Sequence, residues 1–186
     1  MGNAILEETL KELEVTQKEF WNVAKETGNF LNMLVKMNNS QSVLEIGTSN
    51  GYSGLLFLDA LKSTGGMFTT IEFHDSRRLV AVENYNKCGF SGKYNSLKGD
   101  ACEILKSFCE KDKFDFVFID ANKREYVEYF KIIKPHLLPH SIIAADNVNS
   151  HREKIQTFLD SIYADKDFQT EILDLPGGLS VSYKLS

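Results

Sequence analysis

The sequence lacks any long apolar run and any excess of positive charge. No stretch approaches the roughly 18 apolar residues of a membrane-spanning helix, and the N-terminus has no apolar signal core. The 21 Lys and Arg residues are outnumbered by 26 Asp and Glu residues, which gives a net charge of −5. We therefore expect a cytoplasmic protein without membrane contact, and the acidic balance disfavours an obligate nucleic-acid binder.

Cysteine is also scarce. Cys88, Cys102 and Cys109 cannot all pair with one another and show no C-x-x-C spacing, which favours reduced thiols over a disulfide framework. The sequence contains no P-loop, zinc or G-x-S-x-G signature. With 186 residues, the chain is long enough for one domain and one sizeable core. We expect a single domain over residues 1–186, with a helical cover at 1–38 and a core at 39–186.

Short apolar segments alternate with amphipathic ones along the chain. Helical spacing is found over residues 6–21, 30–37, 51–61, 77–88, 101–109, 123–133 and 154–163, with a break at Gly28. Strand patterns cover residues 42–47, 67–72, 94–98, 114–120, 141–146, 168–173 and 179–185. This alternation predicts an α/β fold with a seven-stranded, mostly parallel sheet and helices on both faces. The last two strands have no helix between them, which predicts an antiparallel hairpin at the C-terminus.

A glycine-containing turn follows the first strand in the segment VLEIGTSNGYS. Gly47 and Gly51 permit a sharp turn and close approach of the backbone to a ligand, and the next helix begins with unpaired N–H groups. The G-x-x-x-G spacing differs from the G-x-G-x-x-G of dinucleotide folds and suits an uncharged thioether with an amino-acid tail. A tight strand-to-helix turn without any ligand would show the same pattern.

Two acidic residues follow the next strands. Glu72 ends the strand in TTIE, close to the offset of about 20 residues at which an acid accepts both ribose hydroxyls in nucleotide-binding folds. The alternative is a solvated acid at a strand end. Asp100, in the segment GDA, is suited to accept the amine of adenine or to cap the following helix, and these two roles are compatible.

Three oxygen-bearing side chains end two further strands. Asp120 ends FDFVFID, and Asp146 with Asn147 ends SIIAADN. Two carboxylates and an amide at adjacent strand ends suit Mg²⁺ or another hard divalent ion, whereas each Asp alone would be read as a loop or capping residue. Lys123 lies close behind Asp120 and, beside a cation and a buried pocket, is suited to act as a general base; taken alone it would be surface charge.

The motifs VLEIGTSNGYS, TTIE, GDA, FVFIDANKREYVEYF and AADNV resemble, in this order, the cation-dependent class I O-methyltransferases. That family includes the catechol and caffeoyl-CoA methyltransferases and their bacterial relatives. The resemblance covers about Glu26 to Leu185 and implies a Rossmann-like fold with S-adenosylmethionine (SAM) and Mg²⁺, or another divalent cation, as cofactors. It implies cofactor contacts from Glu45, Gly47, Thr48, Ser49, Gly51, Tyr52, Ser53, Glu72, Phe73, Gly99, Asp100, Ala101 and Asp120. It also implies metal ligands at Asp120, Asp146 and Asn147, and a catalytic role for Asp120 and Lys123.

The reaction implied by the resemblance is methyl transfer to a small catechol-like or vicinal-hydroxyl acceptor. The two hydroxyls chelate the cation, Lys123 takes the proton, and the methyl group passes in line from sulfur to oxygen. The sequence departs from the catechol enzyme at Asn122, where that enzyme has an aromatic residue over adenine. The segment Val148–Arg152 is also short, which predicts a shallow, open acceptor site.

Other functions stay open from the sequence alone. A hydroxylated uridine of tRNA is an alternative acceptor, although the acidic net charge argues against a nucleic-acid partner. A catalytically silent binder of SAM or another adenosine ligand is an alternative of a different class. An NAD-linked oxidoreductase is disfavoured by the glycine spacing. A homodimer is expected because many relatives dimerise.

Overall fold

The structure is a computed structural model that describes residues 2–186, with side-chain burial from residue 4 onward. The helices are α1 (Gly2–Val15), α2 (Gln17–Phe20), α3 (Lys25–Met37), α4 (Tyr52–Thr64), α5 (Asp75–Lys87), α6 (Ala101–Lys106), α7 (Tyr126–Ile133) and α8 (Arg152–Ala164), with 3-10 turns η1 (Lys123–Glu125) and η2 (Lys134–His136). The strands are β1 (Ser42–Ile46), β2 (Met67–Glu72), β3 (Tyr94–Lys98), β4 (Phe114–Ile119), β5 (Leu137–Asp146), β6 (Phe168–Leu173) and β7 (Leu179–Lys184).

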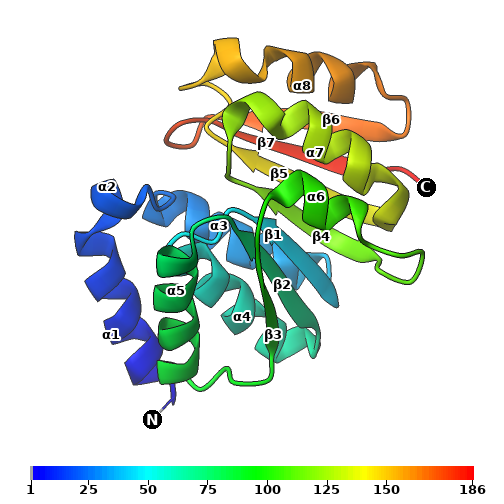
Figure 1. Ribbon diagram of the computed structural model, residues 1–186. Helices are drawn as coiled ribbons and strands as arrows, with labels where there is room; N and C mark the ends of the chain where they lie inside the picture. The colour runs from blue at the N-terminus through cyan, green and yellow to red at the C-terminus, as the bar shows by residue number, and fades with distance from the viewer. Residues whose placement is uncertain (1) are drawn as a thin grey trace.

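The seven strands form one sheet in the order β3-β2-β1-β4-β5-β7-β6 (Figure 1). Strands β1 to β5 pair parallel with one another, whereas β7 pairs antiparallel with both β5 and β6. The chain leaves β1 toward β2 and later returns to β4 on the other side of β1, so the strand order reverses between β1 and β4. The predicted α/β fold with its closing hairpin is confirmed. In such a sheet, ligands bind beyond the carboxyl ends of the strands at this reversal.

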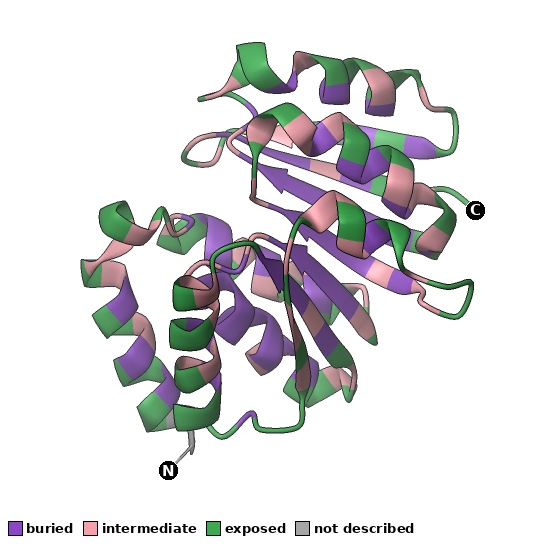
Figure 2. Ribbon diagram, viewed as in Figure 1, coloured by how far each residue is buried: buried purple, intermediate pink, exposed green. Residues whose placement is uncertain are grey.

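Helices cover both faces of the sheet, and the strands between them are largely buried (Figures 1 and 2). Helices α1, α3, α4 and α5 pack on one face, and α6, α7 and α8 pack on the other. The Phe57 ring of α4 lies 5.6–5.8 Å from the rings of Phe68, Phe116 and Phe118, which project from β2 and β4. No helix within residues 2–186 combines the length and the apolar character needed to cross a bilayer.

Several helix and strand boundaries differ from the sequence prediction, and two of the differences have a clear structural basis. Gly28 does not break the chain but lies inside α3, where its N–H donates to Ala24 O at 2.9 Å. A Cβ at Gly28 would lie 2.6 Å from Leu56 Cδ1, so this glycine lets α3 pack closely against α4. Strand β5 begins at Leu137, earlier than the expected residue 141, because it continues through Pro139 where its register against β4 shifts.

We predict that Phe57→Ala lowers the free energy of unfolding by about 3–5 kcal/mol, because it removes a fully buried ring and leaves a cavity among three aromatic neighbours. Urea denaturation followed by circular dichroism measures this change. Leu79→Ala on α5 is the control, since Leu79 is 53% exposed and its truncation should change stability by less than about 0.5 kcal/mol. Equal effects of the two substitutions would contradict the assigned core.

Candidate active site

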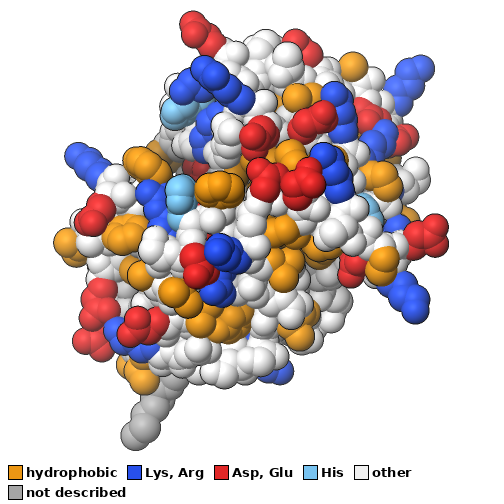
Figure 3. Space-filling view, in the orientation of Figure 1, with side chains coloured by type: hydrophobic (Ala, Val, Ile, Leu, Met, Phe, Trp, Pro, Cys, Tyr) orange, Lys and Arg blue, Asp and Glu red, His pale blue; other side chains and the backbone are white. Residues whose placement is uncertain are grey.

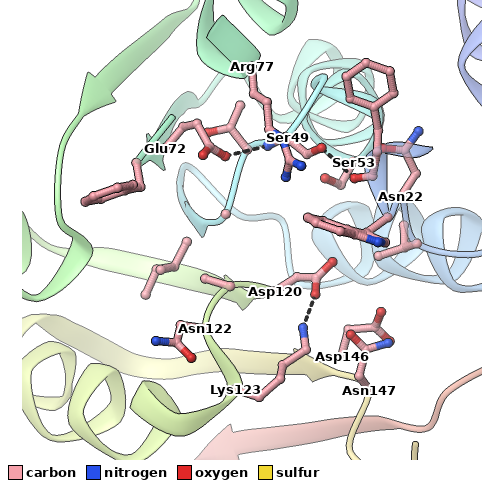
Figure 4. Close-up of a pocket in the computed structure, with 18 of the residues that line it drawn as sticks. Asn22, Ser49, Ser53, Glu72, Arg77, Asp120, Asn122, Lys123, Asp146 and Asn147 are labelled. Carbon is pink, nitrogen blue, oxygen red and sulfur yellow. Dashed lines mark hydrogen bonds and ion pairs between the residues drawn. The ribbon is translucent and has the colours of Figure 1, made fainter. Parts of the chain in front are cut away.

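The carboxyl ends of β1, β2, β4 and β5 open onto a cavity of about 990 Å³ (Figure 4). Its walls come from the loops after these strands, from the N-terminal segment around Trp21, and from the hairpin loop at Pro176 and Gly177. The volume lies near the upper end of the ~300–1,000 Å³ range of small-molecule sites, which leaves room for two ligands. The segment around Trp21 forms one wall of this cavity, which the prediction of a shallow, open acceptor site did not include.

The turn after β1 begins with Gly47, whose φ of 105° is in the region that favours glycine. A Cβ at this position would lie 2.1 Å from the carbonyl oxygen of Asp120, so no side chain fits between the two strand ends. The Asp120 N–H donates to Ile46 O at 2.9 Å, which continues the β1–β4 pairing up to the cavity. Gly47 thereby brings the turn and the end of β4 into contact.

A buried carboxyl group lies beneath this turn. Glu45 is fully buried in β1, and its carboxyl oxygens accept hydrogen bonds from Ser53 Oγ at 2.5 Å and Thr70 Oγ1 at 2.6 Å. Thr70 Oγ1 also lies 2.5 Å from Thr48 Oγ1. Burial raises the pKa of Glu45 to about 8 despite these hydrogen bonds, with a smaller contribution from Asp120. At pH 7 this group is therefore mostly protonated.

Glu72 at the end of β2 is held as a hydrogen-bond acceptor. Its Oε2 accepts from the backbone N–H of Ser49 at 2.8 Å (Figure 4), and its Oε1 accepts from that of His74 at 2.8 Å. Each carboxylate oxygen has a further lone pair for a ligand hydroxyl. Asp100, after β3, accepts a hydrogen bond from the Glu103 N–H at 3.1 Å and caps α6, as expected for one of its two predicted roles.

Two further acidic residues, Asp120 and Asp146, lie at the ends of β4 and β5. Lys123 Nζ lies 2.6 Å from Asp120 Oδ1, and both side chains are mostly buried. Asp146 is 2% exposed, and its buried Oδ1 has no hydrogen-bond partner among the described residues. Burial and repulsion by Asp120 raise the pKa of Asp146 well above its usual range. The cluster thus contains two nearby carboxyl groups and one neutralising lysine.

Asn147 follows in a left-handed conformation with φ of 65°, and its side chain borders the cavity (Figure 4). The loop after it is tied to the C-terminal hairpin by backbone hydrogen bonds. Val148 N–H donates to Gly178 O at 3.0 Å, and the N–H groups of residues 149 and 150 donate to Gly177 O at 2.9 and 3.0 Å. His151 also borders the cavity, and burial, with a smaller effect of nearby Lys123, lowers its pKa.

The structure brings most of the predicted site residues together around the cavity. These are Gly47, Thr48, Ser49, Ser53, Glu72, Phe73, Gly99, Asp100, Ala101, Asp120, Lys123, Asp146 and Asn147. Three predicted cofactor contacts lie behind the wall instead. Glu45 is beneath Ser53, Gly51 packs on the ring of Tyr85, and Tyr52 points away and donates to Glu14 of α1 at 3.2 Å. These three residues therefore contact the turn after β1 from behind and do not border the cavity.

Other cavity residues escaped the sequence argument. Trp21 and Asn22 enter from the segment before α3, Arg77 from α5, and Glu125 and Tyr129 from the other face. Tyr129 Oη donates to Glu125 Oε2 at 2.5 Å. Only Trp21 carried a signal in the sequence, as the single tryptophan of the chain. Arg77, Glu125 and Tyr129 lie within ordinary helical patterns, Asn22 follows one, and nothing in their spacing marks the side that faces a ligand.

A comparison with known protein families shows to which family this chain belongs. A profile of the O-methyltransferase family matches residues 2–166. The chain belongs to this O-methyltransferase family. The predicted membership is confirmed, and the match to the O-methyltransferase profile also includes α1, which lies before the region covered by the sequence motifs.

Two enzymes illustrate the similarity of this chain to characterised members of the O-methyltransferase family. The catechol O-methyltransferase of Niastella koreensis is 34% identical over 128 residues, which are 68% of this chain and 58% of that protein. The caffeoyl-CoA O-methyltransferase 1 of Eucalyptus globulus is 33% identical over 147 residues, 75% of this chain and 59% of that protein. The chain thus spans just under three fifths of the length of these two relatives.

Solved structures confirm the Rossmann-like O-methyltransferase fold. The O-methyltransferase from Bacillus cereus, crystallised with S-adenosylhomocysteine (SAH), superimposes with a TM-score of 0.87 at 24% identity and covers 97% of this chain and 90% of that one. The O-methyltransferase TomG from Streptomyces achromogenes, crystallised with SAM, gives a TM-score of 0.86 at 24% identity, over 96% and 90% of the two chains.

The protonated state of Glu45 leads to a prediction on stability. Because its pKa is about 8 in the folded protein and near 4.5 when unfolded, the folded state holds an extra proton between these values, and stability falls as the pH rises through them. Glu45→Gln keeps a neutral side chain that can bond both hydroxyls. We expect the melting temperature of the wild type to fall more steeply between pH 5 and pH 9 than that of the variant.

Calorimetric melting at both pH values measures this difference, and Glu171→Gln on β6 is the control, since Glu171 is exposed and far from this network. Parallel pH dependences of the wild type and Glu45→Gln would contradict the raised pKa of Glu45.

Proposed function

We propose that the chain is a SAM-dependent and divalent-metal-dependent O-methyltransferase acting on a hydroxyl of a small catechol-like acceptor. One observation carries this proposal. Asp120 and Asp146 converge beside Lys123 in the same cavity in which Glu72 and Asp100 follow β2 and β3. One cavity thus contains hydrogen-bond acceptors suited to a nucleoside and, beside them, an acidic cluster with a lysine. Methyl transfer between two bound molecules requires such adjacent sites.

The cofactor side is supported by the fold neighbours that were crystallised with SAH and SAM. In this chain, Glu72 binds the ribose hydroxyls with an orientation fixed by Ser49 and His74. Phe73 and Ala101 border the space for adenine, and the free oxygen of Asp100 accepts its amine. Gly47 keeps the turn open so that the backbone can approach the methionine part of the cofactor.

The donor set of the second cluster fits a hard divalent cation. Asp120, Asp146 and Asn147 offer carboxylate and amide oxygens, and the buried Oδ1 of Asp146, which has no hydrogen-bond partner among the described residues, is suited to an electropositive partner. Among the described residues, no group of three or more His, Cys, Asp or Glu side chains is placed to hold a metal ion, and the amide oxygen of Asn147 would be the third protein ligand. A divalent cation held there supplies the charge that favours ionisation of a bound hydroxyl group.

Lys123 is the base in this proposal. Its Nζ takes the proton of the attacking hydroxyl, and the ring of Tyr126, 5.3 Å from Nζ, restricts the side chain on one side. Asp120 holds Lys123 in place by the 2.6 Å contact.

A small acceptor is favoured by the named relatives and by the surface charge. The two curated relatives carry the names of catechol and caffeoyl-CoA methyltransferases. On the face shown in Figure 3, Lys and Arg side chains are interspersed with Asp and Glu rather than gathered in one field. A protein that holds a phosphate backbone usually presents a continuous basic patch. We therefore place a small catechol-like compound before tRNA as the acceptor.

The metal requirement is tested with purified protein, labelled SAM and Mg²⁺ against catechols, hydroxycinnamoyl thioesters and bulk tRNA. We expect methylation of a catechol that chelator abolishes and Mg²⁺ restores. Asp146→Asn should lower kcat/KM by more than about 100-fold, beyond the loss typical of residues that only support metal ligands. Calorimetric binding of SAH should persist in this variant. Asp160→Asn, exposed on α8, is the control. Full activity in chelator would refute the metal role.

The base is tested separately. Lys123→Met should lower kcat by about 10²–10⁴-fold, the usual contribution of a general base. Because the base is removed, the activity that remains should increase with pH as hydroxide replaces the amine. Lys131→Met, on the exposed side of α7, is the control. If Lys123→Met retains wild-type kcat and an unchanged pH profile, another group takes the proton.

A further inference from the structure

Trp21 borders the cavity, and hydrogen bonds hold the backbone on both sides of it. Trp21 directly follows the short helix α2 as its C-cap, with a left-handed φ of 55°. Ser49 Oγ, in the turn after β1, donates to the Phe20 carbonyl oxygen at 2.6 Å. Gln17 Nε2 donates to the Asn22 carbonyl oxygen at 3.2 Å. The backbone on both sides of Trp21 is therefore anchored, although its indole is 71% exposed.

Arg77 of α5 lies against this indole, with its guanidinium carbon 4.4 Å from the ring centroid. Figure 4 shows the side chain reaching from its helix toward the middle of the pocket. Within residues 2–186, Arg77 forms no ion pair or side-chain hydrogen bond, whereas the adjacent Arg78 pairs with Asp75 at 2.7 Å. Contact with an aromatic face engages the charge of a guanidinium and leaves its in-plane N–H donors available.

The carboxylates of the cavity do not satisfy this arginine. Glu72 is bound on both oxygens by the backbone N–H groups of Ser49 and His74. Asp120 is paired with Lys123, and Asp146 is buried at the end of β5. The guanidinium of Arg77, with free N–H donors and next to the exposed indole of Trp21, is suited to a ligand that carries both an aromatic ring and a carboxylate.

We infer that Arg77 and Trp21 form an acceptor subsite that selects an aromatic diol bearing a carboxylate. The carboxylate binds the guanidinium of Arg77, and the arene packs against Trp21. This inference rests on the proposed function, because it names the acceptor class of that same cavity. It makes Arg77 a determinant of specificity rather than of the methyl transfer itself.

Equilibrium binding tests this subsite without turnover. Protein loaded with SAH and Mg²⁺ is titrated calorimetrically with 3,4-dihydroxybenzoate and with 3,4-dihydroxybenzamide, its neutral counterpart. The 3,4-dihydroxycinnamate and its amide form a second pair with a longer spacer. We expect one acid or both to bind at least about tenfold more tightly than the matching amide, as expected for a charge-assisted hydrogen bond. Because Trp21 is the only tryptophan, a change in its emission locates the ligand.

Substitutions assign the preference to Arg77. Arg77→Gln should bring the acid and the amide within about twofold of each other, whereas Arg77→Lys should retain part of the preference. Arg78→Gln, the matched control on the same helix, should keep the wild-type ratio. Thermal melting verifies that each variant is folded.

Several outcomes would overturn the inference. The first is that the wild type binds acid and amide equally in both pairs. The second is that Arg77→Gln weakens the acid and the amide equally. The third is that Arg77→Gln loses as much affinity for SAH as for the acid. The last result would assign Arg77 to the carboxylate of the cofactor. Charge-selective binding without methyl transfer to any diol would refute the proposed activity and support the subsite, so the two failures are distinguishable.

Discussion

The ends of β1 and β4 meet at a contact between two backbones, and the arrangement of the cavity depends on it. The Asp120 N–H donates to Ile46 O, and a Cβ on Gly47 would lie 2.1 Å from Asp120 O. The turn that borders the cofactor side and the residues of the acidic cluster are therefore adjacent by main-chain geometry. A shift of either strand end would move both halves of the cavity, so their relative position is set by the sheet rather than by mobile side chains.

The same sheet geometry brings four carboxyl groups to one edge, and the fold treats each differently. Glu45 remains protonated among hydroxyl groups, and Glu72 is bound by two backbone N–H groups. Asp120 is paired with Lys123, and Asp146 is left with one buried oxygen without a partner among residues 2–186. Of these four carboxyl groups, only that of Asp146 keeps a buried oxygen without a hydrogen-bond partner among residues 4–186, which is why the proposed cation site is placed at this part of the edge.

Much of the fold could be predicted because parallel buried strands leave short apolar runs, and β2, β3 and β6 begin and end where the pattern places them. The prediction of a break at Gly28 was wrong, since packing against α4 decided that position and packing is not visible in local spacing.

The strand-end acids could be anticipated from position alone, and they do meet at the cavity. Trp21 and Arg77 could not be anticipated, because their contact joins two distant segments across the sheet edge. For the same reason, the sequence pattern did not show that Tyr52 points away from the cavity toward α1.

The loop after Asn147 is tied to the C-terminal hairpin through main-chain groups at residues 148, 149 and 150. Such hydrogen bonds are indifferent to the identity of the side chains that they hold, and Asn149 and Ser150 are exposed. Substitution there can accumulate without displacing Asp146 or Asn147. This rim is consequently a place where the side chains that border the cavity can vary while the ends of β4 and β5 keep their positions.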